Sequence, residues 1–183
     1  MFNDIRSKSV VFVAHCILNQ NSLSDGTASY PSQIKEVLGL LTKFDVGIVQ
    51  MPCPELLCLG LSRGNIGESL GSIVEENTRI RKMMSTGSAV KEMKKLIKGV
   101  IKQIIEYRKY GFTIKGIVGI NRSPSCGVET TSKDNKEANG RGVFIEALFD
   151  ELSANKINLD FVGIKAFEME EAVVKVEKLL HNK

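Results

Sequence analysis

The stretch "IKGIVGINRSPSCG" (residues 114–127) decides the fold class, because it joins an apolar run to a loop of turn-forming residues. The run Ile114–Ile120 has the composition of a strand that is covered on both faces. The residues after it are rich in Asn, Ser, Pro and Gly, which favour turns. The stretch therefore predicts a buried strand that ends in a loop, and Cys126 lies in that loop.

On either side of this stretch, strand-like and helix-like segments alternate. Further strands are predicted at Ser9–Ala14, Val46–Met51 and Leu159–Lys165. Apolar residues recur at helical spacing in segments 31–44, 72–84, 87–112, 142–155 and 168–182. This order predicts a three-layer α/β fold, Rossmann-like or flavodoxin-like, with a mostly parallel sheet, helices on both faces and right-handed crossovers.

Two of the helices carry boundary signals. Pro31 suits the first turn of the first helix, whereas Ser88 suits the N-cap of the third and Gly111 its C-terminal stop. The lysines of the third helix lie largely opposite its apolar stripe. We expect them to form a solvated face, not a nucleic-acid site.

Composition bounds the class of protein. The chain has 183 residues, is 43% hydrophobic and 25% charged, and has a formal net charge of +4. These values predict one globular domain over residues 1–183 and are too weakly basic to indicate nucleic acid as a partner. No apolar run is long enough to cross a membrane, and the N-terminus is a poor signal peptide, so we expect a cytoplasmic protein. The sequence does not indicate an oligomeric state.

Three of the four cysteines follow predicted strands. Cys16, Cys53 and Cys126 come just after the first, second and third strands, whereas Cys58 lies five residues past Cys53. No Cys-x-x-Cys pair exists, and structural disulfides are disfavoured in the cytoplasm. Because parallel strands end at one edge of a sheet, where open α/β folds bind ligands, the three thiols are predicted to share a crevice.

Such thiols permit several chemistries. Thiolates bind zinc, cuprous copper and iron–sulfur clusters. A structural zinc needs a fourth ligand, which could be Cys58 or His15. A cubane [4Fe–4S] cluster on three cysteines would keep one iron open as a Lewis acid. A single nucleophilic cysteine is a further alternative, but its only plausible base, His15, would tend to point away from its neighbour Cys16.

Polar residues accompany each thiol. Glu55 follows Cys53 by two residues, and Ser123 and Ser125 flank Cys126. The loop after Cys16 offers groups that could hydrogen-bond a polar ring of a substrate: Asn19, Gln20, Asn21, Asp25 and Gly26. Each residue alone is explained by turn or cap formation, but the set around three thiols indicates a functional crevice.

Two glycine patterns carry weaker signals. Residues Gly64–Gly71 loosely resemble a phosphate-binding loop but lack its Lys-Ser/Thr ending and a preceding strand, so we expect a flexible loop. Residues Asn139–Gly142 precede a helix, and their backbone amides could bind an anion.

Taken together, four segments resemble the motifs of a bacterial family called DUF523, which is associated with thiouracil desulfidase. They are "CILNQNSLSDG" (16–26), "MPCPELLCLGLSRG" (51–64), "SPSCG" (123–127) and "NGRGVFIEAL" (139–148), and they occur in the family's order along nearly the whole chain. The third is the most specific. The resemblance implies a [4Fe–4S] cluster held by Cys16, Cys53 and Cys126.

The resemblance also implies an activity. Sulfur would be removed from a thiolated heterocycle such as thiouracil, a small-molecule substrate, by non-redox hydrolysis at the open iron. By position, Glu55 is the expected base, and Ser123 or Ser125 the expected proton relay or substrate contact.

The chain departs from the family motifs at several positions. The residues that differ are Asn19, Leu23, Ser24, Cys58, Leu59 and Ser62. These changes spare the three cysteines, so we expect a divergent, desulfidase-related member that retains the cluster ligands but need not act on thiouracil. The alternative is a non-catalytic protein that holds a cluster or metal in sulfur trafficking or sensing.

Overall fold

A four-stranded parallel sheet forms the centre of the protein. The computed structural model describes residues 2–65 and 71–182. The sheet order is β2-β1-β3-β6, with β1 (Ser9–Val13), β2 (Gly47–Gln50), β3 (Thr113–Ile120) and β6 (Phe161–Ile164). Strand addition reverses direction between β1 and β3, which makes their carboxyl ends the switch point where such folds bind ligands.

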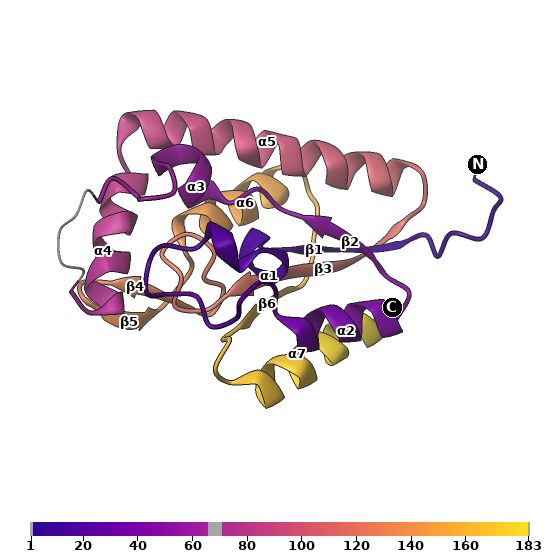
Figure 1. Ribbon diagram of the computed structural model, residues 1–183. Coiled ribbons are helices and arrows are strands. Elements are labelled where there is room, and N and C mark those ends of the chain that lie inside the picture. Colours follow the sequence, from indigo (N-terminus) through magenta and orange to yellow (C-terminus); the bar gives the residue numbers. More distant parts are fainter. Residues whose placement is uncertain (1, 66–70, 183) are drawn as a thin grey trace.

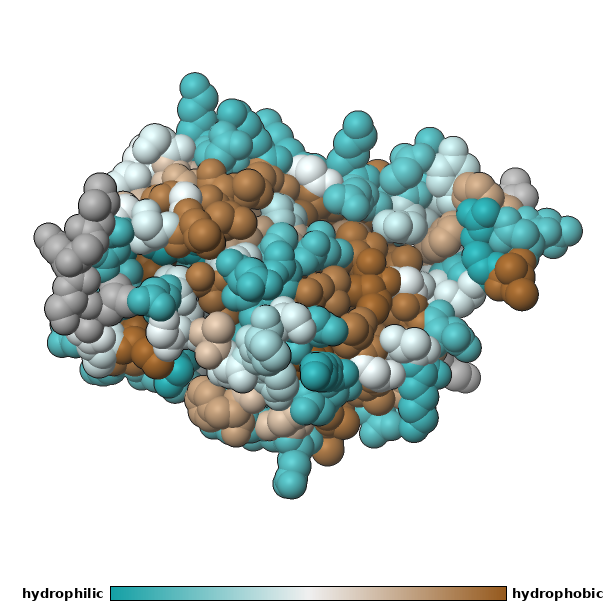
Figure 2. Space-filling model, in the orientation of Figure 1, coloured by the Kyte–Doolittle hydropathy of each residue, from teal (hydrophilic) through white to brown (hydrophobic). Residues whose placement is uncertain are grey.

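Helices cover both faces of this sheet, so the predicted three-layer α/β fold is confirmed. Helices α5 (Gly87–Lys109) and α6 (Val143–Ala154) lie on one side, and α2 (Lys35–Lys43) and α7 (Met169–His181) on the other (Figure 1). The apolar stripe of α5 is buried against the core, whereas its lysines are exposed. Figure 2 shows hydrophilic side chains along the edge where α5 runs.

Several short elements at the carboxyl edge of the sheet were not predicted. They are α1 (His15–Leu18), the 3₁₀ turn η1 (Gln20–Ser22), α3 (Pro54–Leu59) and the antiparallel hairpin of β4 (Thr130–Lys133) and β5 (Lys136–Asn139). The predicted helix α4 (Ile73–Met84) packs against this hairpin. Elements of three to six residues are too short to show a hydrophobic period.

Two predicted helix boundaries were wrong. Helix α2 begins at Lys35, not near Pro31, because Ser32 and Ile34 form backbone hydrogen bonds with Gln20 and Ile17 that hold the preceding segment out of the helix. The N-cap of α5 is Thr86, which directly precedes Gly87, the first residue of the helix. Ser88 lies inside the first turn and is not the cap.

Residues 66–70 of the predicted loop Gly64–Gly71 lie outside the described residues. The expectation of a flexible loop there therefore stays a prediction. No helix in the described ranges has both the length and the apolar character that spanning a membrane requires.

A pair of glycines lets the loop after β3 fold back on the sheet. Gly119 on β3 pairs with Gly163 on β6. A Cβ at Gly119 would lie 2.6 Å from Val128 Cγ2 and against the Cys126 carbonyl oxygen, which accepts a hydrogen bond from Ile120 N. The absence of a side chain at Gly119 thus sets how closely Cys126 approaches the sheet.

We expect Gly119→Ala to lower the free energy of unfolding by about 1–3 kcal/mol, because the added methyl group overpacks the backbone of the loop. Urea denaturation of the metal-free protein measures this change. The matched control is Gly99→Ala in exposed α5, where a Cβ meets nothing within 4 Å; that change should stabilise by about 0.5–1 kcal/mol. A Gly119→Ala protein as stable as wild type would contradict the close approach.

Candidate functional site

Three buried thiols gather at the carboxyl edge of the sheet. Cys16 lies in α1, Cys53 is the N-cap of α3, and Cys126 lies in the loop after β3. The sheet hydrogen bonds continue past the strand ends, from Ala14 N to Val118 O and from Met51 N to Val13 O. These bonds hold the first two loops beside the third.

The thiols are electrostatically linked. Burial raises the pKa of the Cys16 thiol, and the charges of Cys53 and Glu55 raise it further. Burial also raises the pKa of Cys53, with Glu55 as the next cause. The pKa of Cys126 lies well above its usual value because of burial and then the charges of Cys16 and Cys53. These shifts make the thiolate forms costly unless a cation or metal compensates their charge.

The Glu55 carboxylate joins the second loop to the third. Its Oε1 accepts a hydrogen bond from Ser125 Oγ at 2.5 Å, and Ser123 Oγ lies 3.5 Å from the same oxygen. Ser123 Oγ also accepts from the backbone N–H of Cys126 at 3.0 Å, and Ser125 Oγ lies 3.6 Å from Cys126 Sγ. The structure thus brings together Glu55, both serines and a cysteine.

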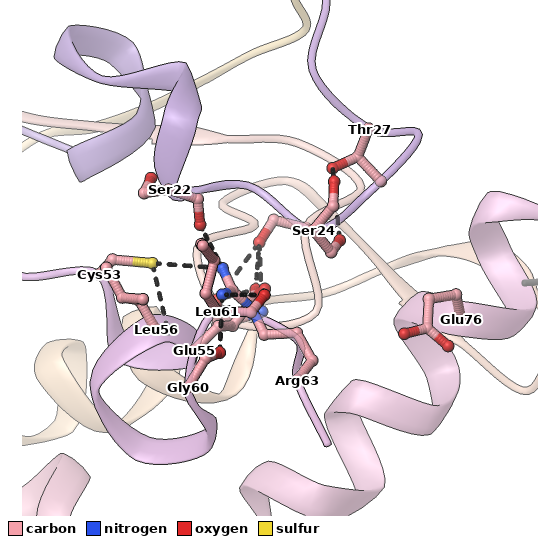
Figure 3. Close-up of polar contacts among 12 residues, drawn as sticks. Ser22, Ser24, Thr27, Cys53, Glu55, Leu56, Gly60, Leu61, Arg63 and Glu76 are labelled. Carbon is pink, nitrogen blue, oxygen red and sulfur yellow. Dashed lines mark hydrogen bonds and ion pairs between the residues drawn. The ribbon is translucent and has the colours of Figure 1, made fainter. Parts of the chain in front are cut away.

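Arg63 contacts both Glu55 and Cys53, and its side chain is fully buried (Figure 3). Its Nε lies 3.4 Å from Glu55 Oε2. Its Nη1 donates to the carbonyl oxygens of Gly60 and Leu61, and its Nη2 donates to that of Ser22 and lies 3.9 Å from Cys53 Sγ. Arg63 is the arginine of the second motif, but it was not predicted as a site member.

The loop that carries Cys126 is held from two sides. Asn121 Oδ1 accepts from the backbone N–H groups of Val128, Glu129 and Thr130. Arg81 of α4 donates to the carbonyl oxygens of Pro124 and Arg141. The position of Asn121 directly after β3 was a usable signal, whereas no sequence pattern linked α4 to this loop.

A pocket of about 90 Å³ opens beside these groups. Cys16, Glu55 and Ser123 line it, and Ser125 is buried behind them. Further lining comes from residues that were not predicted as site members: Leu23, Ser24, Thr27, Asn77, Asn121, Arg122 and Pro124. Asn77 extends from α4 and donates to Ser132 Oγ at 3.2 Å.

Of the predicted ring-binding residues, only Gln20 lines the pocket. Asn19 caps η1 by accepting from Asn21, and Asn21 is exposed. Asp25 accepts from the N–H of Gly26 in an exposed turn. The structure therefore does not bring Asn19, Asn21, Asp25 or Gly26 into the pocket with Glu55.

The fourth cysteine and His15 stand apart from the thiol cluster in their contacts. Cys58 Sγ lies 3.6 Å from Ala89 O of α5. Burial lowers the pKa of His15, and a hydrogen bond with the Met51 backbone opposes that shift. Within the ranges 2–65 and 71–182, no three His, Cys, Asp or Glu side chains are arranged to hold a single metal ion.

The chemistry of these donors restricts the groups that could bind here. Three buried thiols on three loops are donors of the kind that iron–sulfur clusters, zinc and cuprous copper take.

Comparisons with known proteins agree with this arrangement. The profile of the family described as 2-thiouracil desulfurase matches residues 11–158, a range that includes all three loops. An uncharacterized protein of Methanocaldococcus jannaschii is 30% identical over 176 residues, which cover 96% of this chain and 97% of that protein. No solved structure matched significantly. The chain therefore belongs to the 2-thiouracil desulfurase family.

Proposed function

We propose that this protein is a desulfidase, which replaces the sulfur of a thiolated heterocycle, such as thiouracil, by oxygen. One observation carries the proposal: three buried thiols and a serine-bound carboxylate gather at one edge of the sheet, where Cys16 and Glu55 line a pocket. A thiol enzyme would instead need a histidine base beside its nucleophile. His15 is adjacent to Cys16 in the chain, and its hydrogen bond is with the Met51 backbone.

Cys16, Cys53 and Cys126 would hold a [4Fe–4S] cluster in this proposal. When bound, the cluster supplies a Lewis acid that attracts the thiocarbonyl sulfur. Cys16 lies both in the ligand set and in the pocket wall, so a cluster held by these cysteines would border the pocket.

The overall reaction needs water but no electrons. A thiocarbonyl and one water give a carbonyl and hydrogen sulfide, with the C=S bond broken and a C=O bond formed. Glu55 is the proposed general base. A carboxylate has about four acceptor sites, so Glu55 can accept from a water while Ser125 and Arg63 hold its two oxygens.

The two serines have different places and therefore different proposed roles. Ser125 is buried behind the pocket and donates the short hydrogen bond that orients Glu55. Ser123 lines the pocket and reaches the same carboxylate oxygen, so it can pass a proton between Glu55 and the substrate.

The pocket favours a small substrate. Its volume of about 90 Å³ is well below the roughly 300–1,000 Å³ of sites for larger ligands. Ile34, Ile73 and Ile120 provide apolar walls, and the amide of Asn77 adds a polar group. A planar ring with polar edges matches this lining.

Sulfide release tests the proposal as a whole. The protein, reconstituted anaerobically with iron and sulfide and then desalted, should release hydrogen sulfide from 2-thiouracil in many turnovers without a reductant. A loaded protein that releases none from 2-thiouracil or related thioamides would support the alternative of a cluster-binding protein in sulfur trafficking or sensing.

We expect replacement of Cys16, Cys53 or Cys126 by serine to abolish the brown colour of the reconstituted protein, because each thiolate binds one iron. Iron and sulfide analysis should fall from about four of each per chain to a small residue. The matched control is Cys58→Ser, which should keep wild-type iron content. Equal iron loss in all four variants, or in none, would contradict the assignment of ligands.

Glu55→Gln should lower kcat by about 100-fold or more, because the amide keeps an acceptor oxygen for Ser125 but cannot take a proton from water. Initial rates of sulfide release at equal iron content give this value. Glu106→Gln, on the exposed face of α5, serves as the control and should retain the wild-type rate. A Glu55→Gln protein with wild-type kcat would remove Glu55 from the mechanism.

A further inference from the structure

We propose that Arg63 is a positioning residue for this site, which fixes the Glu55 carboxylate and places a positive charge beside Cys53. The inference rests on the proposed function. It concerns a residue that does not line the pocket and so cannot contact the substrate directly.

The hydrogen bonding of Arg63 is complete. A guanidinium has five N–H donors, and five acceptors face this one: Glu55 Oε2, the carbonyl oxygens of Ser22, Gly60 and Leu61, and Cys53 Sγ. These acceptors come from the first and second loops. Two of these acceptors, Glu55 and Cys53, belong to the proposed site.

The backbone around Arg63 is shaped to deliver this side chain. Its φ of 52° lies in the left-handed region, which is uncommon for residues other than glycine. Arg79 of α4 donates to the Arg63 carbonyl oxygen at 2.9 Å and is itself paired with Glu76. Unfavourable backbone conformations of this kind persist where surrounding contacts hold them, and they concentrate at functional sites.

The positive charge of Arg63 lies where the proposed site concentrates negative charge. A [4Fe–4S] core with three thiolate ligands would have a net negative charge in its common oxidised state, and Glu55 would add another to this buried region, where uncompensated charge is costly. Arg63 is the buried cation in contact with two of these groups. Its guanidinium therefore places a positive charge against the Glu55 carboxyl group and the Cys53 sulfur.

The two oxygens of the Glu55 carboxylate have different partners. Arg63 binds Oε2 and Ser125 binds Oε1, so the plane of the Glu55 carboxylate is held from both ends. Without Arg63, one oxygen would lose its partner and the carboxylate could rotate. Misplacement of a catalytic group by about 1 Å can cost on the order of 100-fold in rate.

The test compares Arg63→Met, which removes the charge, with Arg63→Lys, which keeps it but lacks the planar fork. At equal iron content, Arg63→Met should lower kcat about 100-fold with KM near wild type, and shift the reduction potential of the cluster to a more negative value. Arg63→Lys should restore the potential toward wild type but not kcat. EPR-monitored redox titration and sulfide release measure the two quantities.

Arg81→Met provides the control for a merely structural arginine. Arg81 also holds a site loop through backbone carbonyls, but in the described part of the chain it has no hydrogen bond to Glu55 or to a cysteine. It should lose thermal stability and keep the wild-type potential. An Arg63→Met protein with wild-type kcat and reduction potential would overturn the proposal. If Arg63→Met does not fold, an Arg63→Lys protein with wild-type kcat would overturn it instead.

A measurement on the metal-free protein separates this inference from the proposed function. A double-mutant cycle of Arg63→Lys and Glu55→Gln should show non-additive changes in the free energy of unfolding, because the two side chains interact directly. Additive changes would overturn the positioning role. If wild type binds no iron and releases no sulfide while the cycle shows coupling, the proposed function fails but the Arg63–Glu55 contact stands.

Discussion

The site depends on a constraint of the parallel sheet, that strands running in one direction end at one edge. Strands β1, β2 and β3 are adjacent, so the loops that follow them must meet. Each of these loops carries one buried thiol. The order of the strands is therefore enough to bring together residues that lie more than 100 positions apart in the chain.

Fine positioning within that edge comes from polar contacts across the loops. Glu55 of the second loop binds the serines of the third, and Arg63 binds both Glu55 and the Ser22 carbonyl of the first. Few of these contacts are exposed to water. Because buried polar groups are costly when unpaired, such a network holds each member in one arrangement.

The sequence predicts those parts of the structure whose pattern lies within a single segment of the chain. The four core strands and the long helices were predictable, because each has an apolar run or a helical period of its own. The three thiols could be placed from strand order alone. The hairpin β4–β5 and helix α3 are too short to show a period, and the contacts of Arg63 depend on a turn with a left-handed residue. Asn77 lines the pocket because α4 packs on the hairpin, and no local sequence pattern predicts that packing.

The proposed reaction hydrolyses a carbon–sulfur bond without electron transfer. The most direct measurement is turnover of 2-thiouracil by the anaerobically loaded protein in water enriched in oxygen-18, with no reductant present. Non-redox hydrolysis predicts equal amounts of sulfide and uracil, and one oxygen-18 atom in each uracil molecule. Product that lacks the label, or turnover that stops until an electron donor is added, would contradict it.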